Sequence, residues 1–145
     1  MAIGARYASF LAAGITMISI GALIAGCAQT PTAPGPRLFA VDLAGAARGC
    51  AVSKVVPAAG QQVPVTMTVN NDGGWCAIVV ANNGSPFDAG LLTVEPQHGK
   101  VLIHSVGNDT RIDYTPAGGY VGVDAFSVQL LPGNATLRTS VKVSR

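Results

Sequence analysis

Hydrophobic and polar residues alternate with a period of two over most of the chain from residue 63 onward. In Val63–Val69, apolar side chains occupy every second position and threonine or proline the others, and Thr136–Val143 repeats this pattern. Such alternation predicts strands with one buried face. In the last run we expect Leu137, Thr139, Val141 and Val143 to point inward and Arg138, Ser140 and Lys142 to point outward.

Other short apolar runs fit strands and are separated by turn clusters rich in Gly, Asn and Pro. Trp75–Ala81 is apolar on both faces, which is typical of a central strand. No segment after residue 60 has helical periodicity, so the pattern predicts six or seven strands in a single all-β antiparallel sandwich over residues 38–145. The remaining runs are Leu91–Val94, Lys100–Val106, Arg111–Thr115 with Ile112 and Tyr114 on one side, and Asp124–Leu131 with Phe126, Val128 and Leu130 together.

Residues 38–59 carry a weaker pattern. Leu38–Leu43 fits an edge strand and Ala44–Arg48 fits a helical turn. From the pattern of this segment we therefore expect little more than that it is attached to the sandwich.

The first 26 residues are organised differently. Met1–Arg6 is a short segment whose one charged side chain is Arg6, and Tyr7–Ala22 is apolar. This is the layout of a secretory signal peptide. An uncleaved transmembrane helix is the alternative, because about twenty apolar residues can span a bilayer.

The end of this segment is more specific. Leu23-Ile24-Ala25-Gly26-Cys27 resembles the lipobox of bacterial lipoproteins. The resemblance implies cleavage before Cys27, which leaves 119 of the 145 residues, and attachment of diacylglycerol and fatty acids such as palmitate to that cysteine. Two or three acyl chains give stable anchoring, whereas one is marginal.

A tether follows at residues 27–37. Pro31, Pro34 and Pro36 disfavour helix and sheet, so we expect an extended, semi-rigid spacer. No Asp follows Cys27, and in enteric bacteria an Asp there resembles an inner-membrane retention signal. The expected location is the outer membrane, facing the periplasm or the cell surface.

A second resemblance covers the last fifty residues. Three segments resemble the bacterial Ig-like and cadherin-like domains of surface proteins. They are Pro96-Gln97-His98-Gly99-Lys100-Val101, Tyr114-Thr115-Pro116 and Tyr120-Val121-Gly122-Val123-Asp124-Ala125-Phe126. The resemblance implies a fold signature without catalytic meaning. It implies that Gly99 and Gly122 serve turns, that Tyr114 and Phe126 fill the core, and that Asp124 caps the loop before the penultimate strand. The N-terminal half departs from the pattern because it carries two cysteines.

Those cysteines, Cys50 and Cys76, remain if Cys27 is acylated. An even pair in an exported protein predicts a disulfide. It would close a loop of about 27 residues, worth roughly 3 kcal/mol in the chain-entropy model. A redox or metal pair is disfavoured because the two lie far apart in sequence with no nearby histidine.

Composition removes several functional classes. Hydrophobic residues make up 49% of the chain and charged residues 11%, with a net charge of +2. Nucleic-acid binders need a clustered basic face, and acidic disordered chains are poor in aliphatics. We therefore expect neither, and no motif for a nucleophile or cofactor is present.

Metal binding is also disfavoured. The two histidines, His98 and His104, have only Glu95 as a nearby third ligand, so we expect them on loop and strand surfaces. A Ca²⁺ site needs six or more oxygens, and Asp109, Asp113 and Asp124 supply too few without carbonyl help.

The sequence thus predicts a membrane-anchored envelope lipoprotein with a non-enzymatic structural or binding role, no cofactor, and an envelope protein as partner. The loops at 82–90, 107–110 and 117–123 are the expected contact sites at the ends of the sandwich. The alternative is an inhibitor of a host or competitor enzyme such as lysozyme. We expect no contact with nucleic acid.

Overall fold

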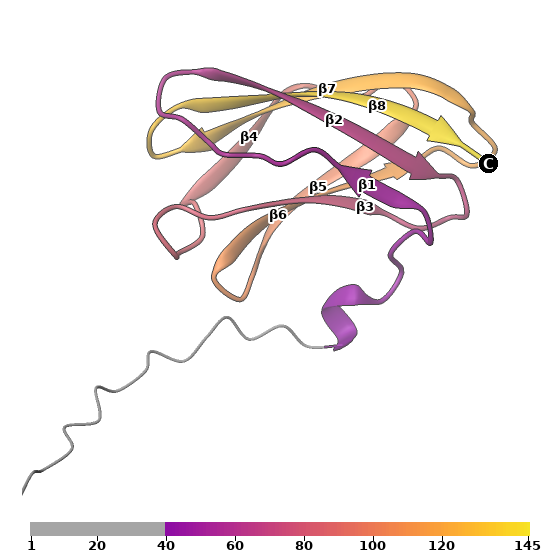
Figure 1. Cartoon of the computed structure of the whole chain (residues 1–145), viewed down its shortest axis with the longest axis horizontal. Helices are drawn as coiled ribbons and strands as arrows, with labels where there is room; N and C mark the ends of the chain where they lie inside the picture. Colours follow the sequence, from indigo (N-terminus) through magenta and orange to yellow (C-terminus); the bar gives the residue numbers. More distant parts are fainter. Residues whose placement is uncertain (1–39) are drawn as a thin grey trace, which may run out of the picture. The chain divides into compact units, whose positions relative to one another are not determined.

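Two β-sheets pack face to face in the computed structural model, which describes residues 40–145 (Figure 1). The expected all-β sandwich is confirmed. The proposed signal peptide, Cys27 and the tether lie outside the described residues, and within 40–145 no helix is long and apolar enough to span a membrane. The elements are the 3₁₀ helix η1 (Ala40–Leu43) and strands β1 (Cys50–Val52), β2 (Gln62–Asn70), β3 (Cys76–Val80), β4 (Ala89–Val94), β5 (Gly99–Val106), β6 (Asp109–Pro116), β7 (Gly122–Leu131) and β8 (Ala135–Ser144).

One sheet has the strand order β1-β2-β8-β7-β4 and the other β3-β6-β5. Every pairing is antiparallel except that of β2 with β8, which run parallel from Gln62 opposite Thr136 to Asn70 opposite Ser144. Parallel neighbours need a long crossover connection. Here strands β3 to β7 form that connection, so the pairing joins the first long strand of the domain, β2, to its last strand, β8.

The core lies between the sheets and follows the alternation read from the sequence. Val65, Met67 and Val69 of β2 are buried. Tyr114 and Phe126 are 0% and 1% exposed, and their rings stack with centroids 5.7 Å apart. The inward and outward facing of β8 is confirmed in full: its Leu137, Thr139, Val141 and Val143 are buried, while Arg138, Ser140 and Lys142 are exposed.

The expected central position of the Trp75–Ala81 run is wrong. β3 is an edge of the three-stranded sheet, and β6 is its central strand. The outward-facing Val79 of β3 is 53% exposed, whereas β6 buries the charged Arg111 and Asp113 on the same side of the sheet. Charges at a buried central position are tolerated here because they pair with each other.

The segment before β1 also differs from expectation. Ala40–Leu43 is a 3₁₀ helix where an edge strand was expected, and the expected helical turn at 44–48 is a turn followed by a bridge from Ala46 to Trp75. Gly45 has φ of +81°, a left-handed conformation that stops the helix. The short strand β1 was not predicted, because three residues are too few to show alternation.

Two roles implied by the Ig-like resemblance are corrected. Gly99 begins β5 under the Tyr114 ring, where a Cβ would lie 2.4 Å from a ring carbon, so close packing rather than a turn requires glycine. Gly122 begins β7 with φ of +153° and is likewise not in a turn. Asp124 caps the loop between β4 and β5, not the loop before β7, because its carboxylate accepts the Gln97 and His98 amides.

The three loops expected to form contacts lie at both ends of the sandwich. The loop after β3 and the β5–β6 hairpin share one end, because Val80 pairs with Thr110 at the start of β6. The loop between β6 and β7 follows Pro116 at the other end. They therefore do not form one continuous surface.

Candidate functional site

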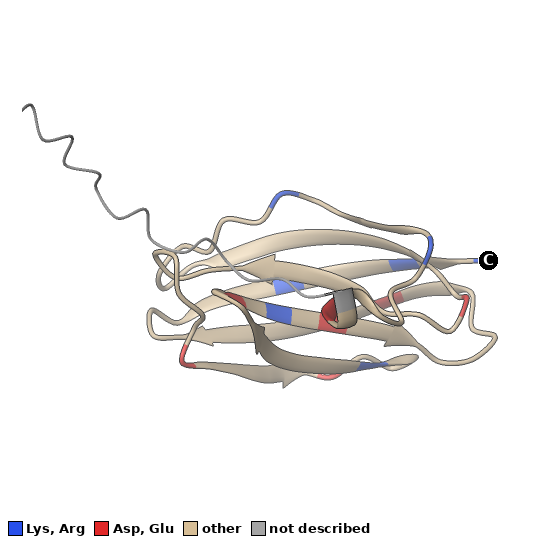
Figure 2. Cartoon of the chain, turned by 90° about the horizontal axis from the view of Figure 1, so that it is seen from below, with Lys and Arg blue, Asp and Glu red and all other residues tan. Residues whose placement is uncertain are grey.

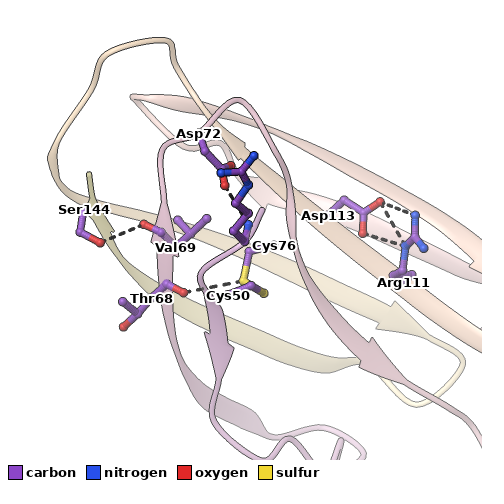
Figure 3. Close-up of a disulfide and its surroundings, with 9 residues drawn as sticks. Cys50, Thr68, Val69, Asp72, Cys76, Arg111, Asp113 and Ser144 are labelled. Carbon is purple, nitrogen blue, oxygen red and sulfur yellow. Dashed lines mark hydrogen bonds and ion pairs between the residues drawn. A yellow bond between two sulfur atoms is a disulfide. The ribbon is translucent and has the colours of Figure 1, made fainter. Parts of the chain in front are cut away.

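The disulfide predicted from the cysteine count joins the two sheets (Figure 3). Cys50 belongs to β1 of the five-stranded sheet and Cys76 to β3 of the three-stranded sheet, and their sulfurs are 2.06 Å apart. The bond therefore closes one lateral side of the sandwich and attaches the N-terminal segment to β3. Cys76 is completely buried.

A carboxylate fixes the chain next to this bond. Asp72 accepts hydrogen bonds from the Arg48 amide at 2.8 Å and from the Gly74 amide at 3.0 Å. These two bonds, that of Arg48 first, lower the pKa of Asp72. Gly74 lets the two segments meet, because a Cβ there would lie 2.4 Å from the Ala47 nitrogen.

Residues 40–48, which we call the N-terminal strap, cross the outer face of the three-stranded sheet at Trp75. The Trp75 indole donates to the Ala44 carbonyl at 3.0 Å. The Trp75 backbone accepts from the Ala47 amide at 2.8 Å and donates to the Gly45 carbonyl at 3.0 Å. Figure 1 shows η1 below the sheet that contains β3, β6 and β5, and Figure 2, seen from below, shows it in front of that sheet.

A buried arginine lies under the strap. The Arg111 guanidinium stacks on Trp75, 4.2 Å from the ring centroid, and donates to the Asp42 carbonyl of η1. Its Nε lies 2.9 Å from Asp113 Oδ1, and its Nη2 donates to Asp113 Oδ2 at 2.9 Å. Arg111 is 7% exposed and Asp113 4%. One arginine thus links β6, the tryptophan and the strap.

His104 completes this cluster. Its Nε2 lies 3.0 Å from Asp113 Oδ2 and 3.2 Å from Arg111 Nε. The contact with Asp113 needs a proton on His104 Nε2, whereas the contact with Arg111 needs the same nitrogen as an acceptor, so each tautomer makes one of the two hydrogen bonds. The expected surface histidine is therefore a hydrogen-bonding partner of a buried ion pair.

The side chains of the other residues weighed as metal ligands do not gather at one point. His98 stacks on Tyr120 with centroids 4.1 Å apart, at the far end of β5 from His104. Asp124 faces the Tyr114 hydroxyl, whereas Asp113 faces the opposite side of β6. Within residues 40–145, no three His, Cys, Asp or Glu side chains come close enough to hold a metal ion.

Asp124 and Tyr114 form a second buried polar contact, between the sheets. Burial raises the pKa of Asp124, but donation from three amides and from the Tyr114 hydroxyl at 2.9 Å outweighs it, so its pKa is lowered overall. Burial, then the bond to Asp124, raises the pKa of Tyr114. The ionised acceptor and the protonated donor stabilise each other. The amides belong to Gln97, His98 and Ala125.

Exposed aliphatic side chains lie on the strap and on the sheet face that the strap crosses. Val79 of β3 pairs with Arg111 and Leu102 of β5 pairs with Asp113, so both share the outer face of the sheet. Residues on either side of Asp42 in η1 add two more. We call this set the aliphatic patch: Val41 (76% exposed), Leu43 (55%), Val79 (53%) and Leu102 (60%). Sequence reasoning missed it, although the doubly apolar Trp75–Ala81 run was a signal for Val79.

The outer face of the five-stranded sheet is different in character. It carries a shallow groove of about 690 Å³. Its floor presents hydroxyl side chains and one lysine from β2 and β8, and two exposed aliphatics, Val94 and Val123, also line it. The hydroxyl and cationic residues are Thr66, Thr68, Ser140 and Lys142.

Comparison with known proteins adds no assignment: no family model matches the chain, and no curated protein matches it.

Proposed function

We propose that this protein is an envelope lipoprotein, anchored by lipid on Cys27, whose sandwich domain has a non-enzymatic structural or binding role. The observation that carries the proposal is a lipobox-like segment, Leu23–Cys27, ahead of a domain with a disulfide between its sheets. Structural disulfides persist in oxidising compartments outside the cytoplasm. The odd cysteine of three is then the one at the proposed cleavage site.

The strand order supports the Ig-like part of the proposal. When the six strands from β3 to β8 are lettered B to G in chain order, one sheet has the order B-E-D and the other the order G-F-C. Ig domains place strands B, E and D in one sheet and C, F and G in the other, which is the same arrangement. Strand β2, parallel to β8, is an addition to this frame.

A binding role rather than a catalytic one is supported by the state of the buried ionisable groups. Arg111 and Asp113 neutralise each other, and Asp124 is saturated by amides and a hydroxyl. Catalytic groups need a reactive atom open to a substrate. These groups instead hold one part of the chain to another.

Metabolic labelling with a fatty-acid analogue tests the anchor. The wild-type protein should take up label and fractionate with membranes, and Cys27→Ser should do neither. A protein with Cys50→Ser and Cys76→Ser is the matched control and should keep its label, because only Cys27 follows the lipobox-like segment. Label on Cys27→Ser, or none on the wild type, would contradict the proposal.

Capture from envelope extracts tests the binding role. The anchored protein should retain envelope proteins after washing. Selective recovery of a soluble cell-wall hydrolase would favour the inhibitor instead.

A further inference from the structure

We propose that the outer face of the three-stranded sheet, with the aliphatic patch at Val41, Leu43, Val79 and Leu102, rests on the surface of the bilayer that holds the lipid on Cys27. This inference depends on the lipid anchor of the proposed function. It adds which face of the domain meets the membrane.

The first argument is the length and attachment of the tether. Residues 28–39 provide twelve positions between the proposed anchor and η1, a reach of at most about 43 Å when fully extended. The chain enters the domain through η1, which is bound to the outer face of the three-stranded sheet through Arg111. The tether therefore joins the domain at this face and not at the opposite sheet, so this face is the one that the anchor can bring to the membrane by the shortest path.

The second argument is the chemistry of that face. Association with a membrane surface grows with the apolar area that leaves water. Four large aliphatic side chains, each more than half exposed, lie on this face or on the η1 segment bound to it, and so does one half-buried tryptophan. Tryptophan and exposed lysine both suit the headgroup layer, and Lys100 lies on the same face of β5 as Leu102.

The third argument is the low cost of bringing this face to lipid. Its most central charges, Arg111 and Asp113, are already out of water and paired. Resting on a bilayer therefore requires no further desolvation of these two charges. The outer face of the other sheet also carries exposed aliphatics, Val94 and Val123, but they lie among hydroxyl and charged side chains and the tether does not enter the domain there.

Trp75 is the only tryptophan in the chain and lies on the proposed face, so it reports on the contact directly. The full lipidated protein is placed in vesicles of phosphatidylethanolamine and phosphatidylglycerol, with or without bromine on the upper acyl carbons. Bromine quenches only nearby indoles. We expect Trp75 emission to fall in brominated vesicles and not in unbrominated ones.

Paired variants identify the surface responsible. Val79→Ser with Leu102→Ser should reduce the quenching, since it removes half of the aliphatic patch. Val123→Ser removes an even more exposed aliphatic, 77% exposed, from the other sheet and should leave quenching unchanged. Emission in unbrominated vesicles confirms that the packing around Trp75 is intact in each variant.

The outcomes separate this inference from the proposed function. If the acylated protein stays on the vesicles but Trp75 is not quenched, the docking is wrong and the anchor stands. If the protein lacks lipid and washes off, the proposed function fails. Quenching that persists unchanged in Val79→Ser with Leu102→Ser, or cross-linking of two copies through this face, would overturn the assignment of the patch to the membrane.

Discussion

The two faces of strand β6 are both buried, but by different kinds of contact. Ile112 and Tyr114 point between the sheets and are 0% exposed, whereas Arg111 and Asp113 point outward and are 7% and 4% exposed. The inner face is covered by the apolar residues of the opposite sheet. The outer face is covered by the N-terminal strap, whose Asp42 lies 69 residues before Arg111 in the sequence, and hydrogen bonds to Arg111 and Trp75 hold the strap in place.

The comparison shows that two equally buried faces of a strand can contribute differently to the free energy of unfolding. Apolar burial contributes through the area removed from water, about 25 cal/mol per Å². A buried ion pair contributes little net stability, but losing one partner is costly because the other charge remains buried. The inner face should therefore dominate stability, and the outer face should decide where the strap lies.

The largest expected effect is on the inner face. Phe126→Ala removes the ring that stacks on Tyr114 and should lower the free energy of unfolding by about 3–5 kcal/mol. Lys142→Ala, outward on the neighbouring β8, is the control and should change it by no more than about 0.5 kcal/mol. Urea unfolding measures both. A stable Phe126→Ala with a collapsed Lys142→Ala would reverse the facing of β7 and β8.

Loss of the disulfide comes next. Replacing both Cys50 and Cys76 by Ala should cost about 3 kcal/mol, because the unfolded chain regains the freedom of a loop with a sequence separation of 26. The same double variant should also loosen the strap, since the bond attaches β1 to β3. Thermal unfolding with and without a reductant measures the first effect, and unchanged melting on reduction would contradict it.

The outer face should respond to loss of charge. Asp113→Asn leaves Arg111 buried without its counter-charge and should cost about 2 kcal/mol. Replacing the pair together, with Arg111→Met and Asp113→Leu, should cost less than the sum of the two single changes. Asp109→Asn, at the start of the same strand, is the matched control. Additive costs would show that the pair does not act as a unit.

The smallest effect depends on pH. Because the pKa of Asp124 is lower in the folded protein, its contribution is present above the unfolded value of about 3.9 and is lost as pH falls through the folded value. The stability gap between wild type and Asp124→Asn should thus be constant near neutral pH and shrink in acid. Urea unfolding across this range measures it, and a gap that widens in acid would contradict the geometry.

The inner face of the sandwich could be predicted from the sequence, because a period of two in one segment is a local signal. The alternation in β2 and β8 identified the buried side chains, and the resemblance to Ig-like domains predicted that Tyr114 and Phe126 fill the core, where both are buried. The cysteine pair followed from counting. Each of these features can be predicted from the residues of a single strand or from the number of cysteines.

The outer face could not be predicted in the same way. Whether Arg111 and Asp113 are exposed depends on a segment far away in the chain, and that segment shows no clear pattern. The doubly apolar β3 suggested a central strand, yet its outward Val79 is exposed and β6 takes the central place. Sequence alternation reports which side of a strand is apolar, not what covers the other side.

The intact mass of the protein extracted from the envelope tests the account most directly. We expect the mass of residues 27–145 plus diacylglycerol and fatty acid, two hydrogens lighter before reduction than after it. A mass that retains residues 1–26, or a mature chain without added lipid, would contradict the lipid anchor. Equal masses before and after reduction would contradict the disulfide.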